Sequence, residues 1–189
     1  MIKRIILFLI FSINFSFAQD DEISNWFNKE SKQFLEIMNN SNVEKDQNYE
    51  NYKKFVETNF AIKSIAFGLL NEKIIANNDD ELLLLYLDTF KSYLTKTIYN
   101  LANSSTSGDI ELKDIDVKDD VYIINSEISD KSSSVSLYWK VVKVKDSYKI
   151  LDVIVENTSY FVTKKSEFTK FLRKNRGSLN SLIQELEKI

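Results

Sequence analysis

The chain has 189 residues, of which 43% are hydrophobic and 28% are charged, and its formal net charge is −3. This size and composition predict one globular domain with a sizeable core. Because the sequence contains no Cys and no His, it cannot form disulfides, thiol nucleophiles, imidazole acid–base pairs or most zinc sites, and we expect no catalytic residues, no metal and no cofactor.

The first 18 residues follow the pattern of a cleavable secretory signal peptide. Lys3 and Arg4 precede an apolar run, and Ser16 and Ala18 are small residues at the two positions that a signal peptidase recognises. A membrane anchor is the alternative, but polar residues interrupt the run short of the roughly 20 residues that span a bilayer. We therefore expect a signal peptide at residues 1–18.

Removal of this segment leaves a single exported domain, residues 19–189, which we expect in solution outside the cytoplasm. The segment carries two basic residues and no acidic residue, so the net charge falls from −3 to −5. This mildly acidic balance argues against nucleic acid as a partner.

Apolar residues at helical spacing predict three helical zones in the N-terminal half. Ser24 is positioned to cap the first helix, which ends near the polar cluster at residues 39–42. The second zone covers residues 49–75. Gly68 inside this zone indicates either a bend or the close approach of another backbone.

The third helix has the strongest apolar pattern. It follows the turn at residues 77–80, where acidic side chains suit a helix N-terminus. Leu84 and Leu85 widen its apolar stripe beyond half of the circumference at its start. Such a helix is expected either at the centre of the core or as one wall of an apolar cavity.

The hydrophobic period changes from 3.6 to 2 after Gly108, which predicts antiparallel strands. Short strands are expected over residues 110–123, and the polar run at residues 130–133 is interpreted as a hairpin turn. A longer strand begins at residue 134. One of its faces is formed by alternate apolar residues: Val135, Leu137, Trp139 and Val141.

A hairpin turn at residues 146–147 leads to the next strand. One face of this strand is formed by Leu151, Val153 and Val155. The other face is formed by Ile150, Asp152 and Ile154. Because both faces are mostly apolar, we expect both to be covered.

Two helices close the chain. The first covers residues 162–173 and is expected to end at Gly177, and Ser178 is positioned to cap the second. The order of helices, antiparallel strands and helices predicts an α+β domain in which the helices lie on one side of a curved antiparallel sheet.

Six segments follow one another in a specific order and spacing. They are residues 55–60, the set Tyr86, Phe90, Leu94 and Thr97, residues 137–140, residues 148–159, residues 165–168, and Gly177 with Leu179, Leu182 and Ile183. Together they resemble the MlaC family, whose members are periplasmic phospholipid-binding proteins and auxiliary components of an ABC transport system. The resemblance covers about residues 19–189, and its most specific part is the block 139–182.

The chain departs from the family pattern at four positions. Ala61 stands in place of an aspartate, Tyr148 in place of a common Trp, and Lys165 in place of a common Arg. Asn157 stands where the family usually has Gly. Asn is the residue that best tolerates positive φ after Gly, so we expect a left-handed backbone there.

The resemblance implies an apolar pocket between the curved sheet and the helices, an arrangement also similar to nuclear-transport-factor-2-like proteins. It further implies a shuttle without enzymatic activity, which carries glycerophospholipids through the periplasm between the outer and inner membranes and maintains outer-membrane lipid asymmetry. The implied partners are a diacyl phospholipid, an inner-membrane ABC transporter complex with an MCE-type ring, and an outer-membrane lipoprotein complex.

Eleven apolar residues are the expected contacts of the acyl chains. They are Phe90, Leu94, Ile98, Leu137, Trp139, Val141, Val153, Val155, Tyr160, Phe168 and Leu172. The alternative for each is an ordinary core residue, because apolar stripes usually face the core. If the opposite strand face points inward, Ile154 and Thr158 line the pocket instead.

Two other functions stay open. A nuclear-transport-factor-2-like isomerase or dehydratase would use Asp152 with Tyr138 or Tyr160 on an apolar small molecule, whereas a structural Asp152 would accept hydrogen bonds at a sheet edge. A secreted adaptor with a filled core and no ligand is the second alternative. The basic cluster at residues 164–165 and 173–176 suits phosphate head groups or an acidic docking partner, or is a solvated helix face.

Overall fold

Helices precede and follow a run of consecutive strands, so the expected α+β order is confirmed. The computed structural model describes residues 15–40, 44–104, 108–129 and 134–189. In chain order the elements are α1 (Phe15–Asn39), α2 (Lys45–Asn59), α3 (Ile62–Leu69), α4 (Glu72–Ala76), α5 (Asp80–Ser104), β1 (Asp109–Lys118), β2 (Val121–Ser129), β3 (Ser134–Val144), β4 (Ser147–Val155), β5 (Thr158–Ser159), α6 (Tyr160–Lys174) and α7 (Leu179–Leu186). The expected turn at residues 130–133 and most of the expected signal peptide lie outside the described residues.

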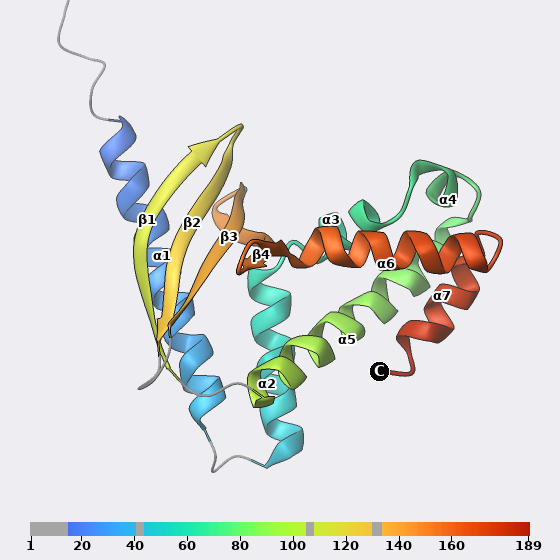
Figure 1. Cartoon of the computed structure of the whole chain (residues 1–189), viewed down its shortest axis with the longest axis horizontal. Helices are drawn as coiled ribbons and strands as arrows, with labels where there is room; N and C mark the ends of the chain where they lie inside the picture. Colours follow the sequence, from blue (N-terminus) through green and yellow to red (C-terminus); the bar gives the residue numbers. More distant parts are fainter. Residues whose placement is uncertain (1–14, 41–43, 105–107, 130–133) are drawn as a thin grey trace, which may run out of the picture.

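The strands form one open antiparallel sheet in the order β1-β2-β3-β4-β5, which curves strongly in Figure 1. The turn between β1 and β2 contains Asp119 and Asp120, and the turn between β4 and β5 contains Glu156 and Asn157. All four residues have positive φ, between 47° and 66°, as two-residue hairpin turns of this kind require. The expected left-handed backbone at Asn157 is therefore confirmed.

A β-bulge changes which residues of β4 share a face. Trp139 pairs with Val153, whereas Val141 pairs with Ile150, so β4 contains one extra residue, Leu151, at this point. The bulge brings Ile150 to the same side of the sheet as Val153. The prediction that these two residues face opposite sides is wrong, because strict alternation ends at the bulge.

A second irregularity lies in β1. The short strands expected over residues 110–123 are in fact β1 and the first part of β2, and β1 continues past a shift in register between Leu112 and Asp114. β1 is therefore one long edge strand, in which every second residue before the shift is exposed.

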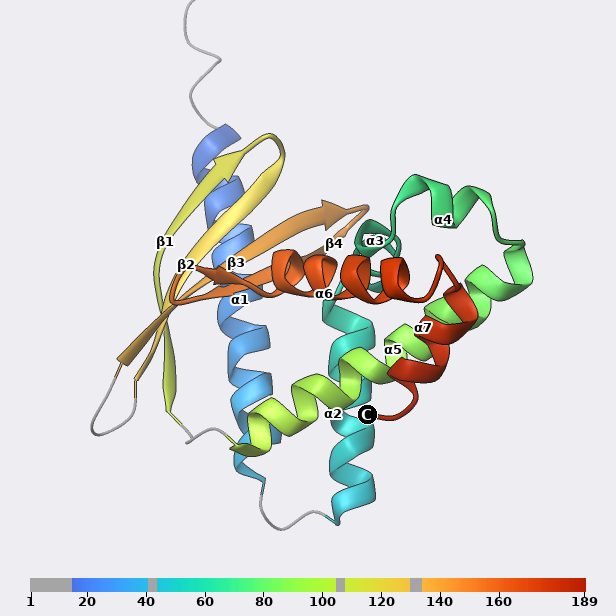
Figure 2. The ribbon, with the colours of Figure 1, turned by 45° about the vertical axis from the view of Figure 1, so that its right-hand side comes forward.

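One face of the sheet is apolar and packs against α1, which runs along it in Figures 1 and 2. We call the buried residues of this contact the sheet cluster: Ile23, Phe27, Tyr122, Ile124, Val141, Tyr148 and Ile150. The ring of Phe27 lies 5.8 Å from that of Trp139, edge to face. Each large apolar side chain buried in this way contributes about 1.5–3 kcal/mol.

The other helices enclose a separate core. We call its buried residues the helical cluster: Val56, Ile65, Ala66, Leu69, Leu70, Ile74, Tyr86, Phe90, Tyr93, Leu94, Phe168, Leu172, Leu179, Leu182, Ile183 and Leu186. Phe60 is half-buried and packs against both clusters. The interior is thus divided into two parts that meet near Phe60.

The helical zone expected at residues 49–75 is divided into α2, α3 and α4. After Asn59 the backbone becomes extended at Phe60 and bridges to Ile150 of β4, and the N–H of Ala61 donates to the Ile150 carbonyl at 2.9 Å. Asn71 then caps α4. The apolar pattern continues through these breaks because each short helix faces the same core. Helix propensity alone would not end α2 at this point, and the pairing with the edge of β4 ends it.

The start of α1 and the exposure of α5 also differ from expectation. α1 begins at Phe15, so Ser24 lies inside the helix and does not cap it, because no Gly or Pro interrupts the preceding residues. α5 begins as expected, with the Asp79 carboxylate accepting from the N–H of Leu82 at 2.8 Å. However, Leu84 and Leu85 are 61% and 50% exposed, so the widened stripe at the start of α5 is not buried.

Both glycines discussed from the sequence have a structural reason. A Cβ atom on Gly68 would lie 3.1 Å from the ring of Phe161, so a side chain makes the close approach and not the backbone that the sequence led us to expect. Gly177 has φ of 78° and follows α6, where its N–H donates to the Leu172 carbonyl at 2.7 Å. The hydroxyl of Ser178 caps α7 as expected.

Within the described ranges, no helix combines the length and apolarity needed to cross a bilayer. The same ranges contain no group of three or more acidic side chains arranged to hold a metal ion.

Replacing Asn157 tests the turn between β4 and β5. Asn157→Gly is expected to keep or slightly raise stability, because Gly adopts positive φ without steric cost, whereas Asn157→Val is expected to lower it by about 1–2 kcal/mol. Urea unfolding followed by circular dichroism measures both changes. Equal stability of the Gly and Val variants would contradict the left-handed turn.

Candidate apolar binding site

Six of the eleven expected contact residues lie on α5 and α6: Phe90, Leu94, Ile98, Tyr160, Phe168 and Leu172. Four of these six are at most 4% exposed and belong to the helical cluster. The rings of Phe90 and Phe168 lie 6.4 Å apart, edge to face. Ile98 and Tyr160 are half-buried and pack against the cluster from outside. The four buried residues are therefore core residues in this structure, which is the alternative stated for them in the sequence analysis.

The other five lie on one face of β3 and β4: Leu137, Trp139, Val141, Val153 and Val155. Leu137 pairs with Val155 and Trp139 pairs with Val153, so the expected shared face is confirmed. On β4, coverage of this face decreases along the strand: Ile150 is 4% exposed, Val153 is half-buried and Val155 is 42% exposed. On β3 the face stays covered, because Leu137 and Val141 are buried and Trp139 between them is half-buried. The apolar face is therefore less covered toward the end of β4.

The two groups differ in the core that they join: the residues on α5 and α6 form or contact the helical cluster, whereas Trp139, Val141 and Val153 form or contact the sheet cluster. In Figures 1 and 2, α5 and α6 separate as they approach the sheet, so that the end of α5 lies near α2 while α6 starts next to the sheet. Five of the eleven expected contact residues are not fully buried and keep accessible apolar surface. We call them the inter-cluster surface: Ile98, Trp139, Val153, Val155 and Tyr160.

Sequence reasoning missed an aromatic row from α1 to α5. The ring of Phe34 lies 5.2 Å from Phe55 and 6.1 Å from Tyr52, and Tyr52 lies 5.4 Å from Tyr99. The row connects α1, α2 and α5 beside the covered face of the sheet. The sequence did contain a signal for this row, because Phe34 follows Phe27 by seven residues on the apolar stripe of α1. The stripe alone did not indicate which residues of the other elements it packs against.

Three polar contacts beside the apolar face pair buried or half-buried groups with one another. The Asn59 side-chain amide donates to Glu30 Oε2 at 2.9 Å, and Lys29 Nζ lies 2.8 Å from Glu30 Oε1. The indole N–H of Trp139 donates to the hydroxyl of Ser126 at 2.8 Å. These partners satisfy groups that would otherwise make an apolar site costly to desolvate.

Asp152 has a structural role at the start of α6. It is 6% exposed, and its two carboxylate oxygens accept from the hydroxyl of Ser159 at 2.7 Å and from the backbone N–H of Phe161 at 2.9 Å. Lys140 Nζ lies 3.8 Å from Oδ2. The prediction that Asp152 accepts hydrogen bonds at the sheet edge is confirmed, and these contacts leave the carboxylate poorly placed to act as a general base with Tyr138 or Tyr160.

Four tyrosines have raised pKa values. Burial raises the pKa of Tyr52 and of Tyr148 to about 12, and it raises the pKa of Tyr86 and Tyr160 further. In each case desolvation disfavours the phenolate. All four side chains are therefore neutral at ordinary pH.

A groove of about 350 Å³ lies on the outer face of α6. It is lined by Val162, Lys165, Ser166, Thr169, Lys170 and Arg173, which recur at helical spacing on one side of the helix. This groove is basic, and none of the eleven expected contact residues lines it. It corresponds to part of the basic cluster noted in the sequence.

A family model described as MlaC protein matches residues 28–188 of the chain. No curated protein matches the sequence. Among solved structures, the chain is similar to the phospholipid-binding protein from Ralstonia solanacearum in complex with a phospholipid, with a TM-score of 0.70 and 19% sequence identity over 86% of this chain and 93% of that chain. At this identity the likeness shows a shared fold.

Removing the Asp152 carboxylate is expected to destabilise the protein strongly. Asp152→Ala leaves the Ser159 hydroxyl and the Phe161 N–H without their acceptor, at a cost of about 2–3 kcal/mol. Asp146→Ala, in the exposed hairpin turn, is the matched control and is expected to change stability by less than about 0.5 kcal/mol. Thermal and urea unfolding measure both, and a wild-type stability for Asp152→Ala would contradict the assigned role.

Tyrosine burial predicts a loss of stability at alkaline pH. Because folding raises the pKa of Tyr52 from 10 to about 12, its contribution is complete below pH 10 and disappears as the pH rises through 12, a change of about 2–3 kcal/mol. Tyr52→Phe removes this group and also a buried hydroxyl that has no hydrogen-bond partner within the described residues. We expect the variant to be at least as stable at pH 7 and less sensitive between pH 10 and 12, as measured by unfolding at each pH. A parallel pH dependence for both proteins would contradict this assignment.

Proposed function

Because the chain belongs to the MlaC family, we propose that it binds a diacyl phospholipid in the periplasm and carries it between the outer and inner membranes. The family match over residues 28–188 is the observation that carries this proposal. The shared fold with a phospholipid-binding protein supports it. On this basis the protein is a carrier without catalytic activity that contributes to outer-membrane lipid asymmetry.

The apolar face of the sheet is the surface that we assign to the acyl chains. Burying one methylene group is worth roughly 0.8 kcal/mol, so a chain of about 16 carbons gains on the order of 12 kcal/mol relative to water. The same chain is already out of water in a bilayer. Transfer between membrane and carrier is therefore close to thermoneutral, and the carrier needs an accessible apolar surface and no reactive group.

We place the acyl chains along the inter-cluster surface, with the buried residues of the eleven as its support. Phe90, Leu94, Phe168, Leu172 and Val141 then act through packing. Leu137 pairs with Val155 across the strands but is 5% exposed, so it also acts through packing.

The proposal includes a signal peptide at residues 1–18 and a single domain at residues 19–189. Its partners are an inner-membrane ABC transporter complex with an MCE-type ring and an outer-membrane lipoprotein complex. The family membership supports these assignments, and the mildly acidic mature chain is consistent with protein and lipid partners in place of nucleic acid.

Lipid extraction tests the proposal directly. The mature protein, purified after export, is expected to release diacyl phospholipid near one molecule per chain when it is extracted with organic solvent and examined by mass spectrometry. A protein that releases none and takes none up from phospholipid vesicles would overturn the proposed function. Release of a different apolar small molecule would favour the enzyme alternative.

A pair of valine variants tests the location of the site. Val155 and Val144 are 42% and 46% exposed and stand at the ends of neighbouring strands. Val155→Glu is expected to lower bound phospholipid at least about fivefold, because a carboxylate on the apolar face must be desolvated by acyl chains. Val144→Glu is expected to leave lipid content unchanged, and both variants should unfold at the wild-type temperature within a few degrees. Equal lipid content in the two variants would contradict the proposed location.

A further inference from the structure

Lys164 lies in an unusual position for a lysine on α6. Its Nζ atom lies 5.9 Å from the ring centre of Tyr93 on α5 and 5.7 Å from that of Tyr160, one turn earlier on α6. Its side chain is 21% exposed, whereas the neighbouring Lys165 is exposed. Lys164 therefore holds its charge between two aromatic rings at the junction of α5 and α6.

The present partner of Lys164 is a weak one. Nζ lies 2.8 Å from Glu167 Oε2, but the Glu167 side chain is 52% exposed, so water and ions compete for this contact. Burial lowers the pKa of Lys164, but hydrogen bonds with Glu167 and Tyr93 outweigh it and hold the pKa above its usual value. A charged ammonium group thus stands in a partly buried place with an exchangeable partner.

A second group at this junction lacks a partner. The buried hydroxyl of Tyr160 has no hydrogen-bond partner within the described residues. Tyr93 and Thr97 lie near enough to affect its pKa, although neither completes a hydrogen bond of normal geometry with it. A buried hydroxyl beside an ammonium group is well suited to a ligand with several acceptor oxygens.

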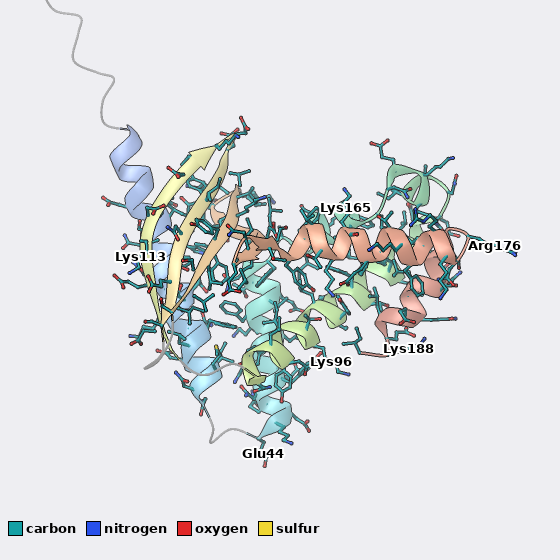
Figure 3. The ribbon with its side chains drawn as sticks, viewed as in Figure 1. Glu44, Lys96, Lys113, Lys165, Arg176 and Lys188 are labelled. Atoms are coloured by element: carbon teal, nitrogen blue, oxygen red, sulfur yellow. The ribbon has the colours of Figure 1, made fainter. Side chains whose placement is uncertain are left out.

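The junction adjoins the proposed path of the acyl chains. Tyr160 is itself part of the inter-cluster surface, and Thr97 precedes Ile98, another member, on α5. α5 and α6 separate from this point toward the sheet (Figures 1 and 2), so an anionic group at Lys164 has apolar surface next to it. Lys165 extends from the opposite side of α6, away from α5 (Figure 3).

We propose that Lys164 and the Tyr160 hydroxyl bind the phosphate group of the carried lipid, and that this phosphate replaces Glu167 as the partner of Lys164. The inference rests on the proposed function, because the lipid supplies the phosphate. It assigns to the carrier a phosphodiester-binding subsite in addition to its apolar surface. The subsite recognises the phosphate that all glycerophospholipids share, and it leaves the terminal head group in solvent.

The test compares two lipids with identical acyl chains, a phosphatidylglycerol and a diacylglycerol, offered in detergent so that membrane attraction has no part. Lys164→Gln is expected to lower phosphatidylglycerol binding about tenfold and to leave diacylglycerol binding unchanged. Lys165→Gln is the matched control and should change neither. Glu167→Gln removes the competing carboxylate and should raise phosphatidylglycerol binding.

Three outcomes would overturn the subsite. The first is that Lys164→Gln weakens binding of both lipids equally. The second is that Lys164→Gln and Lys165→Gln have the same effect on phosphatidylglycerol binding. The third is that Lys164→Gln leaves phosphatidylglycerol binding unaltered. Inorganic phosphate alone is a further probe, and binding of it as tight as that of phosphatidylglycerol would assign the position to free anions. If the wild-type protein binds neither lipid, the proposed function is wrong as well as the subsite. If it binds both lipids and the variants show one of the three outcomes above, only the phosphate subsite is wrong.

Discussion

An open sheet with one apolar face must have that face covered, and the way in which the helices cover it determines the rest of this structure. α1 supplies Ile23 and Phe27 over Tyr122 and Ile124, which buries one part of the face in the sheet cluster. The other helices pack mainly on one another in the helical cluster. Because the two clusters meet at few residues, of which Phe60 is one, the remaining part of the face is left to partly buried side chains. With no Cys in the sequence, packing alone holds the two parts together.

The same division separates the residues that hold the fold from those assigned to the proposed site. Residues such as Phe90 are fully buried and belong to the fold, whereas Val155 combines the proposed face with exposed apolar surface. Polar residues near the site follow a similar division. Asp152 is engaged in starting α6, while Lys164 has a partner that a ligand can replace.

Local rules allowed much of this to be predicted from the sequence. The left-handed positions at Asn157 and Gly177 follow from backbone chemistry, and the shared face of Trp139 and Val153 follows from alternation. The break after Asn59 was not predictable from local rules, because it depends on a pairing with Ile150 some 90 residues away. The bulge at Leu151 was not predictable either, because it has no local sequence signature. For the site, the apolar faces were predictable, but their division between two clusters was not, since a periodic stripe does not specify the surface against which it packs.

Among the described strands, β1 lies at one edge of the sheet, and its charged side chains affect whether this edge can pair with another chain. Charged side chains of both signs recur along it, from Asp109 and Glu111 through Lys113 to Lys118. An uncharged edge of this length would offer its unpaired backbone groups to any other extended polypeptide. Repulsion and hydration of these charges disfavour such strand-to-strand association, so the domain can expose apolar surface elsewhere without polymerising through its edge strand.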